Sequence, residues 1–142
     1  MKALQVPSSL FYELELIGLL VDAAVEAQNR EVLQDYLAKV ESLAQGLNNK
    51  LYLGIAHRGF AALLSLDGNF AAALERLNQA IESFTALDLA YQLGRSHAQR
   101  ASVLAKLGRN EDAQQALHQA LDYYEGLGAT LAIEKARRML DM

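Results

Sequence analysis

The sequence predicts an all-α fold, an α-α superhelix of about seven antiparallel helices with three repeats and a C-terminal capping helix. The first observation is a forty-residue period, in which Gly68, Ala73, Leu77, Gln79, Ala80 and Leu87 recur as Gly108, Ala113, Leu117, Gln119, Ala120 and Leu127. The second is composition, since 52% of the residues are hydrophobic and the chain has a single Pro. The third is the shortness of the predicted turns, which makes consecutive helices antiparallel.

The first part of the chain predicts two helices. Pro7, Ser8 and Ser9 can cap a first helix over about residues 10–27, and acidic residues follow near the positive end of its dipole. A second helix over about 31–45 has apolar residues at helical spacing. It ends where Gly46 begins a polar turn, and the first two helices together form a predicted antiparallel pair.

The rest of the chain predicts two further pairs and a last helix. Gly68 closes a helix because glycine readily adopts the left-handed conformation, and Gly108 is expected to do the same one period later. The predicted helices cover about 50–66, 70–87, 89–107, 111–127 and 129–140. The chain is thus predicted to be a single domain over 1–142, with repeats at about 8–47, 48–87 and 88–127 and a capping helix at about 129–141.

The repeated small residues indicate close helix packing. Ala80 and Ala120 carry only a methyl group, so the companion helix can approach closely, while a leucine one turn earlier fills the space between the axes. Gly54 and Gly94 are predicted to have the same role on the other helix of each pair. Replacing Ala80 by leucine should therefore overpack the interface, at a cost of about 1 to 3 kcal/mol.

Composition and charge exclude several classes of protein. The chain has no Cys, which rules out a disulfide framework, a thiolate zinc site and a cysteine nucleophile. The formal net charge of −4 argues against general affinity for nucleic acid or for anionic membranes. No apolar run is long enough for a signal peptide or a membrane span. We therefore expect a cytoplasmic protein with no cofactor, no nucleic-acid partner and no membrane partner.

The repeated residues resemble a known family. The spacing of Leu64, Gly68, Ala73, Leu77 and Ala80, repeated as Leu104, Gly108, Ala113, Leu117 and Ala120, is similar to that of the tetratricopeptide repeat (TPR). The usual repeat has about 34 residues, so this one is longer, like the extended repeats of bacterial multidomain regulators. The resemblance implies a TPR-like solenoid in which the first helix of each pair lines a concave, protein-binding surface.

The resemblance is uneven along the chain. The repeat at about 8–47 departs from the pattern, since Leu33 stands where Ala73 stands in the next repeat and Gln28 stands where Gly68 stands. The closing segment 124–140 is similar to the end of the repeat regions in bacterial ATPase and cyclase-type regulators. We interpret its last helix as the one that caps the stack.

Candidate catalytic residues are few. His57 and His97 are suitable by residue type, but the repeat relates them to each other, and a residue repeated with its surroundings indicates a shared packing role. No spacing of His and carboxylate residues on one helix suggests a metal site, and no glycine-rich phosphate loop occurs. The sequence therefore predicts neither catalytic nor metal-ligating residues, and we do not expect an enzyme.

The resemblance also selects the residues that would line the concave groove. The first helix of each pair and the capping helix contribute Glu15, Leu19, Asp22, Glu26, Ile55, Arg58, Ala62, Ser65, Arg95, Gln99, Ser102, Lys106, Lys135 and Arg138. In this order the groove is acidic at its N-terminal end and basic at its C-terminal end. One hypothesis is that Arg58, Arg95, Gln99 and Arg138 bind an acidic or carboxylate-bearing segment of another protein. The alternative is that these charges are ordinary solvated residues, as many helix faces carry.

The first helix has more apolar residues than one buried face can hold. Phe11, Leu16 and Leu20 are among ten such residues between Leu10 and Val25, so part of the helix should remain apolar toward solvent. An upstream repeat could cover this surface if the chain were the C-terminal piece of a longer regulator. Alternatively, two copies could pack their first helices about a two-fold axis.

Three hypotheses about function follow from these observations. The leading one is a non-catalytic interaction module that binds a peptide or helix in its groove, as the docking or sensing part of a larger bacterial regulator. The second is a structural unit that dimerises through Phe11, Leu16 and Leu20. The third is a sensor of a small-molecule effector, which requires a deep pocket with convergent polar groups.

Overall fold

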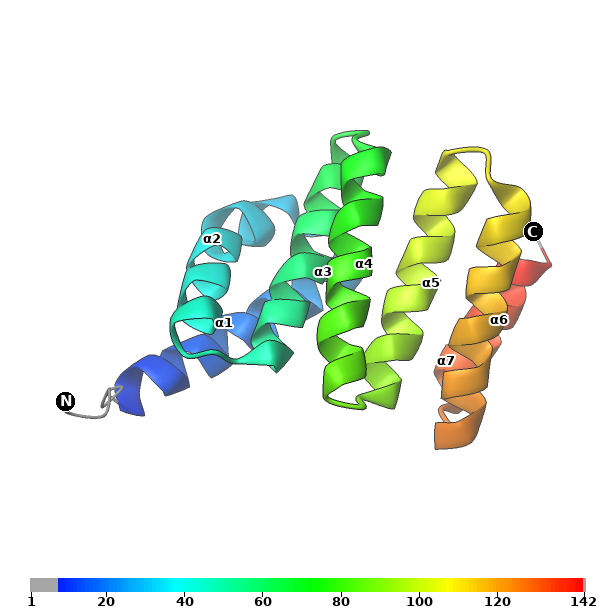
Figure 1. The fold of residues 1–142 in the computed structure, drawn as a ribbon. Coiled ribbons are helices and arrows are strands. Elements are labelled where there is room, and N and C mark those ends of the chain that lie inside the picture. Colours follow the sequence, from blue (N-terminus) through cyan, green and yellow to red (C-terminus); the bar gives the residue numbers. More distant parts are fainter. Residues whose placement is uncertain (1–7, 142) are drawn as a thin grey trace.

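A computed structural model describes residues 8–141, and in this range the chain is an all-helical superhelix (Figure 1). Its elements in chain order are α1 (Ser8–Ala27), α2 (Arg30–Gly46), α3 (Lys50–Leu66), α4 (Phe70–Ala86), α5 (Ala90–Lys106), α6 (Asn110–Leu127) and α7 (Thr130–Leu140). The prediction of an α-α superhelix of about seven helices is confirmed. Both ends of α3 match the sequence-based expectation, and the ends of the other helices lie within two residues of it.

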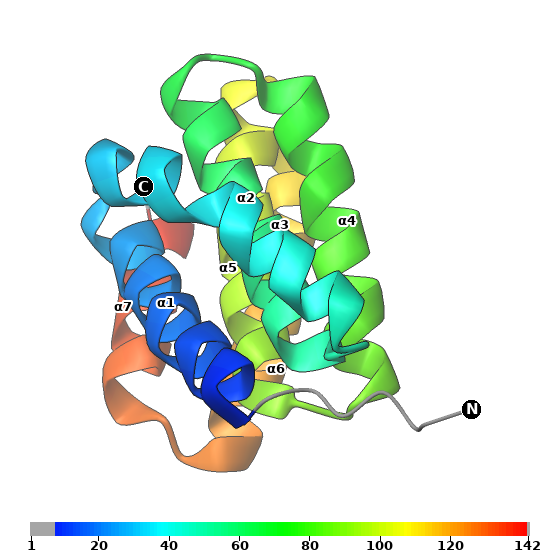
Figure 2. The same ribbon diagram turned by 90° about the vertical axis from the view of Figure 1, so that its left-hand side faces the viewer.

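Successive helices run antiparallel and pack side by side. Contacts are closest within the pairs α3 with α4 and α5 with α6, and α1 packs against both α2 and α3. Helix α7 packs against α6 and continues the stack. Figure 2 shows α1 and α7 together on the side of the stack opposite α4, so that the superhelix curves around this side.

The turns follow from a few local interactions. The Asn49 side chain caps α3, because its Oδ1 accepts a hydrogen bond of 3.1 Å from the backbone N–H of Tyr52. Asn29 caps α2 in the same way. Gly68 and Gly108 have φ values of 77° and 76°, the left-handed conformation that the sequence predicted for them. The prediction that Ser9 caps the first helix is wrong, because α1 already includes Ser8 and Ser9, while Pro7 lies outside the described residues.

The helix pairs approach each other closely where the sequence predicts small residues. A Cβ atom built on Gly54 would lie 2.5 Å from a ring carbon of Phe84 on α4. The same construction on Gly94 gives 2.5 Å to a ring carbon of Tyr124 on α6. Each glycine therefore leaves space for an aromatic ring of the companion helix, and the four repeated alanines are buried beside these contacts: Ala73, Ala80, Ala113 and Ala120.

The apolar core of the described residues is divided into four clusters of buried side chains. Its largest fully buried apolar side chains come from four of the helices and are Leu14, Val21, Leu33, Leu37, Val40, Leu77, Phe84 and Leu104. Over residues 8–141, no helix combines the length with the apolar character that a bilayer crossing requires.

Candidate functional site

The concave side of the superhelix contains an open hollow of about 810 Å³. It is bounded by the C-terminal end of α1 and by α3, α5 and α7, with single contributions from α4 and α6. Nine of the residues that the sequence placed in the groove line it, namely Glu26, Arg58, Ala62, Ser65, Arg95, Gln99, Ser102, Lys106 and Lys135. We call this hollow the concave groove.

Helical spacing explains why these residues share one surface. On α5, Arg95, Gln99, Ser102 and Lys106 follow one another at intervals of three or four residues, so that they lie on one face of the helix. Because α3, α5 and α7 are parallel to one another, their groove-facing residues form adjacent rows. The groove is thus built from the alternate helices of the stack.

Five predicted groove residues do not line the hollow. Glu15 and Leu19 are exposed nearer the start of α1, and Arg138 is exposed on α7 beyond the edge of the hollow. Ile55 is buried in the core, although the sequence placed it in the groove. Asp22 also lies outside the lining, but it takes part in the ion cluster described next.

Arg58 is at the centre of the ion cluster. Its side chain is only 1% exposed, and its guanidinium donates to Asp22 Oδ1 at 3.0 Å and to Glu26 Oε1 at 3.2 Å. It also donates to the side-chain oxygens of Gln92 and Gln99, at 3.3 and 3.1 Å. Gln99 in turn donates to the backbone oxygen of Arg58 at 3.0 Å. The guanidinium is therefore fully engaged within the protein.

Arg95 binds the same two carboxylates from α5. Its Nη1 lies 2.7 Å from Asp22 Oδ2, and its Nη2 lies 2.9 Å from Glu26 Oε1. Its guanidinium carbon also lies 5.7 Å from the centre of the Tyr91 ring, within the range of a cation–π contact. Lys135 of α7 completes the cluster, with its Nζ 3.6 Å from Glu26 Oε2. The cluster joins four helices of the stack across the groove.

These contacts correct the predicted charge distribution. The sequence analysis separated an acidic end of the groove from a basic end, but the structure brings Asp22 and Glu26 of α1 against the basic residues of α3, α5 and α7. The alternative interpretation of Arg58 as an ordinary solvated charge is wrong, because its guanidinium is buried and hydrogen-bonded. The physical reason is the curvature of the superhelix, which places the end of α1 over α3 and α5.

The cluster keeps an excess of positive charge. The groove and its cluster contain four basic side chains, Arg58, Arg95, Lys106 and Lys135, and two carboxylates, Asp22 and Glu26, which leaves two positive charges. The whole chain has a net charge of −4, so the groove differs in sign from the rest of the protein. Such a groove attracts anionic groups.

The pKa of Glu26 reflects this surplus of cations. Burial alone would raise the pKa of this carboxyl, but the hydrogen bond from Arg95 and the charges of Arg95, Arg58 and Lys135 outweigh burial and lower it below the ordinary value. Burial lowers the pKa of Arg58, yet an arginine remains protonated at neutral pH. Glu26 and Arg58 are therefore both ionised at pH 7.

Apolar side chains line both ends of the groove. Tyr91, Tyr124 and Leu131 lie at the end where α5 and α7 begin, and Leu66, Phe70 and Met139 lie at the end where α3 and α7 finish. Leu131 is 82% exposed. Burial raises the pKa of Tyr124 to about 12, so its phenol is neutral at physiological pH. The groove thus combines a charged centre with two apolar ends.

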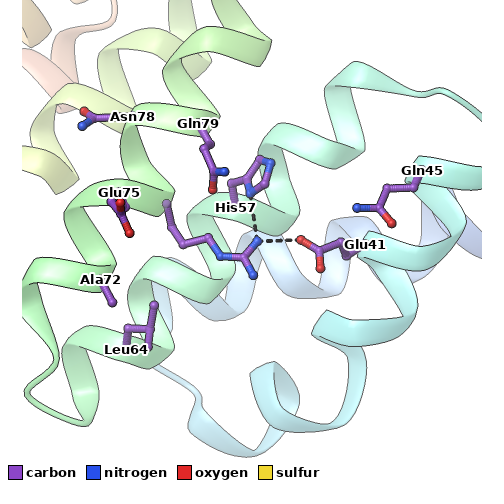
Figure 3. Close-up of a pocket in the computed structure, with 9 residues that line it drawn as sticks. Glu41, Gln45, His57, Leu64, Ala72, Glu75, Asn78 and Gln79 are labelled. Carbon is purple, nitrogen blue, oxygen red and sulfur yellow. Dashed lines mark hydrogen bonds and ion pairs between the residues drawn. The ribbon is translucent and has the colours of Figure 1, made fainter.

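A second hollow of about 560 Å³ lies between α2, α3 and α4, outside the concave groove (Figure 3). Figure 3 shows His57 and Glu41 on either side of a guanidinium, which belongs to Arg76. Arg76 Nη1 lies 2.6 Å from Glu41 Oε2 and 3.0 Å from His57 Nδ1, and its guanidinium carbon lies 4.2 Å from the Phe60 ring centre. Arg76 links three helices here.

Neither histidine belongs to a recognisable catalytic group. Burial first, and the charge of Arg76 second, lower the pKa of His57, so its ring is neutral and accepts the hydrogen bond from Arg76. His97 stacks on Tyr123 with ring centres 5.8 Å apart, and among the described residues its buried Nδ1 has no hydrogen-bond partner. Both rings are therefore packed against neighbouring side chains, and their geometry does not assign them a catalytic role.

Helix α1 exposes an apolar stripe on the face opposite its buried side. The stripe consists of large side chains that are between 43% and 67% exposed: Phe11, Tyr12, Leu16, Leu19 and Leu20. Leu14, Ile17 and Val21 of the same helix are buried in the core. One repeat later, Tyr52 and Ala56 occupy the positions of Tyr12 and Leu16, and both are buried. We call the exposed residues the α1 stripe.

The sequence does contain a pattern that indicates the ion cluster, although the predicted groove did not take this pattern into account. Arg58 stands at the repeat position of Gly18 and Ala98, where small residues pack. A charged residue at a position that is otherwise small and buried indicates that carboxylates lie close to it in the fold. Gln92, Tyr91 and Leu131 were also missed, and their neighbours in sequence give no comparable indication.

No family model, curated protein or solved structure matches the chain. The resemblance to the tetratricopeptide repeat therefore stays a prediction from the repeat spacing, and the argument about function depends on the fold and on the chemistry of the groove.

Proposed function

We propose that the chain is a non-catalytic interaction module that binds a peptide or helix of a partner protein in the concave groove. The observation that carries this proposal is the groove itself, about 810 Å³ in volume, with two surplus positive charges and with apolar side chains at both ends. Curved helical repeats generally use such surfaces for binding. The resemblance to bacterial regulators supports the further proposal that the module is the docking or sensing part of a larger cytoplasmic regulator.

The chemistry of the groove specifies the partner segment. Positive charge at the centre favours aspartate or glutamate, and the apolar ends favour large hydrophobic side chains one or two helical turns away. We therefore propose an acidic segment with flanking apolar residues as the ligand.

Selection of peptides from a random display library tests the proposal. Peptides selected on the wild-type chain should be rich in acidic and apolar residues, and they should bind a Lys106→Glu/Lys135→Glu variant at least about tenfold more weakly. Lys50→Glu is the matched control, because Lys50 is exposed on α3 but does not line the groove. Its affinity for the selected peptides should equal that of the wild type.

Two results would contradict this proposal. Selected peptides that bind the double variant as tightly as the wild type would place the binding surface elsewhere on the chain. A failure to select any peptide, combined with tight binding of a small anionic molecule in the groove, would favour the effector-sensing function, since the volume also lies in the range of small-molecule sites, about 300 to 1,000 Å³.

Self-association is a second candidate function, and the α1 stripe is the observation that favours it. We propose two copies of the chain that pack their stripes about a two-fold axis, since contiguous exposed apolar patches commonly mark interfaces. Light scattering should then give the mass of a dimer, and Leu16→Glu should convert it to a monomer without loss of helicity. Leu131→Glu is the control, as Leu131 is even more exposed but lies on α7. A monomer at every concentration would contradict this candidate.

A further inference from the structure

The side chain of Glu26 lies in a site that is built to hold a carboxylate. Its Oε1 accepts hydrogen bonds from Arg58 Nη2 at 3.2 Å, from Arg95 Nη2 at 2.9 Å and from Arg95 Nε at 3.2 Å. Its Oε2 lies 3.6 Å from Lys135 Nζ. Two donors of one guanidinium, a donor of a second and an ammonium group thus converge on one carboxylate. Through charge-assisted hydrogen bonds, these donors bind strongly to any carboxylate that reaches them.

The two carboxylates of the cluster differ in how firmly they are held. Asp22 is 16% exposed, and each of its oxygens binds a different arginine. Glu26 is 49% exposed and lies one residue before the end of α1, where its side chain can leave the cluster while the core stays packed. Asp22 is therefore a structural partner of the arginines, whereas Glu26 is a replaceable one.

Departure of Glu26 would free a defined set of donors. Arg58 would keep its bonds to Asp22, Gln92 and Gln99, and Arg95 would keep its bond to Asp22. The groups that would lose the Glu26 acceptor are Arg58 Nη2, Arg95 Nε and Nη2, and Lys135 Nζ, and of these Arg95 Nη2 would keep only its longer hydrogen bond of 3.5 Å to the backbone oxygen of Asp22. Both guanidiniums would stay in position, so the site is already organised for a second carboxylate.

We propose that Glu26 is an internal occupant of a carboxylate site, and that an acidic side chain of the bound partner segment displaces it. This inference rests on the proposed function, because it names the part of the groove that binds the acidic residue. While Glu26 occupies the site, the partner competes with it, and the apparent affinity is lowered by the fraction of molecules in which the site is free. The strength with which Glu26 holds the site therefore limits the apparent affinity of the partner segment.

The experiment uses a fluorescent, terminally blocked peptide of alternating glutamate and leucine, titrated into the full chain. Glu26→Gln should raise the affinity for this peptide by about fivefold or more, because the neutral amide competes less well for the arginines. Glu125→Gln is the matched control, since Glu125 is also 49% exposed and is also paired with an arginine, Arg137, but outside the groove. This control should leave the affinity unchanged, and a peptide with glutamine in place of glutamate should not bind.

A second measurement on the wild-type chain does not depend on the folding of a variant. The side-chain carboxyl ¹³C signal of Glu26 should move toward that of a free, solvated carboxylate as the peptide saturates the groove. The Nε–H signals of Arg58 and Arg95 should stay those of bonded guanidiniums, because the peptide replaces the lost acceptor.

The outcomes separate this inference from the proposed function. If Glu26→Gln folds but leaves the affinity unchanged or lowers it, or if the Glu26 signal does not move at saturation, Glu26 is a structural partner and the inference is wrong. The proposed function would stand in that case, provided that display-selected peptides still lose binding to the Lys106→Glu/Lys135→Glu variant. If neither the wild type nor Glu26→Gln binds the acidic peptide, the site does not take a partner carboxylate.

Discussion

The repeats at 48–87 and 88–127 share their packing residues but not their polar residues. In both, a glycine on the first helix faces an aromatic ring on the second, Gly54 with Phe84 and Gly94 with Tyr124, at the same close distance. Arg58 of the earlier repeat has Ala98 as its counterpart, and Arg76 has Ala116. The contacts that hold helix pairs together are therefore repeated, whereas each ion cluster occurs once.

This difference teaches how a repeated scaffold carries a single site. Every helix pair must pack against a neighbour in the same way, so the same small and aromatic residues return in each repeat. The ion cluster, in contrast, forms only once along the concave groove in the described part of the chain, around Arg58 of the middle repeat. Residues that recur therefore indicate packing, and charged residues that break the recurrence indicate the site. The following variants test this distinction, in order of the effect that we expect.

Arg58→Ala replaces the arginine of the middle repeat by alanine, the residue type that the next repeat has at the same position. This substitution should have the largest effect on stability. It should lower the free energy of unfolding by about 3 kcal/mol, because Asp22 and Gln99 lose a buried partner. Urea unfolding followed by circular dichroism measures this change. Arg100→Ala, which removes a half-exposed side chain with one hydrogen bond to Asn78, should cost less than about 1 kcal/mol. If both variants lost the same free energy of unfolding, the burial of Arg58 would not explain its contribution to stability.

Gly54→Ala and Gly94→Ala test the part that the two repeats share. Each added methyl group would overlap an aromatic ring, so each should cost about 1 to 3 kcal/mol, and the two costs should be similar. Gly126→Ala is the control, because nothing lies within 4 Å of a Cβ at that position in α6. Thermal and urea unfolding of the three variants measure the costs. A large cost for only one of the first two would mean that the repeats pack differently.

His57 and His97 occupy the same repeat position with different surroundings. His97→Phe should raise the free energy of unfolding by about 1 kcal/mol, because it removes a buried nitrogen without a hydrogen-bond partner among the described residues. His57→Phe should lower it, since Arg76 then loses an acceptor. Urea unfolding at pH 7 measures both, and the same sign for the two variants would contradict the distinction.

The two histidines also predict the response to acid. Burial, and secondarily the charges of Arg76 and Arg100, lower the pKa of His57 and His97 in the folded state. Below pH of about 6.5 the unfolded chain takes up protons that the folded rings do not, so the stability of the wild type should fall as the pH drops. The double variant with phenylalanine at both positions should lose less stability between pH 7 and pH 5.

Gln28→Gly should have the smallest effect. Gln28 has a φ of 52° at the repeat position where Gly68 and Gly108 have φ values of 77° and 76°. Left-handed backbone costs a side-chain-bearing residue more than glycine, so the substitution should stabilise the chain by about 0.5 kcal/mol. Gln28→Ala is the control and should give no gain. Differential scanning calorimetry resolves the shift in Tm, and an equal shift in both variants would contradict the backbone argument.

More of the fold than of the site could be predicted from the sequence. The helices and their turns were predicted within two residues, because they depend on local spacing, on Gly68 and Gly108, and on the polar residues of the turns. The exposure of part of α1 was also predictable, since its apolar residues are too numerous for one face. Nine groove residues were placed correctly, because the helix that lines a concave surface recurs with the repeat.

By itself, the sequence determined the helices, the repeat and the small residues that let helix pairs approach, since all of these are properties of neighbouring residues or of one fixed period. Only the tertiary structure decided which charges meet. Arg95 and Asp22 are separated by 73 residues, and Arg58 and Asp22 by 36. They meet because the packing of each pair on the next sets the curvature of the superhelix. That curvature brings the end of α1 over α3, α5 and α7, as Figure 2 shows for α1 and α7, and it brings charges from four helices into one ion cluster around the buried Arg58.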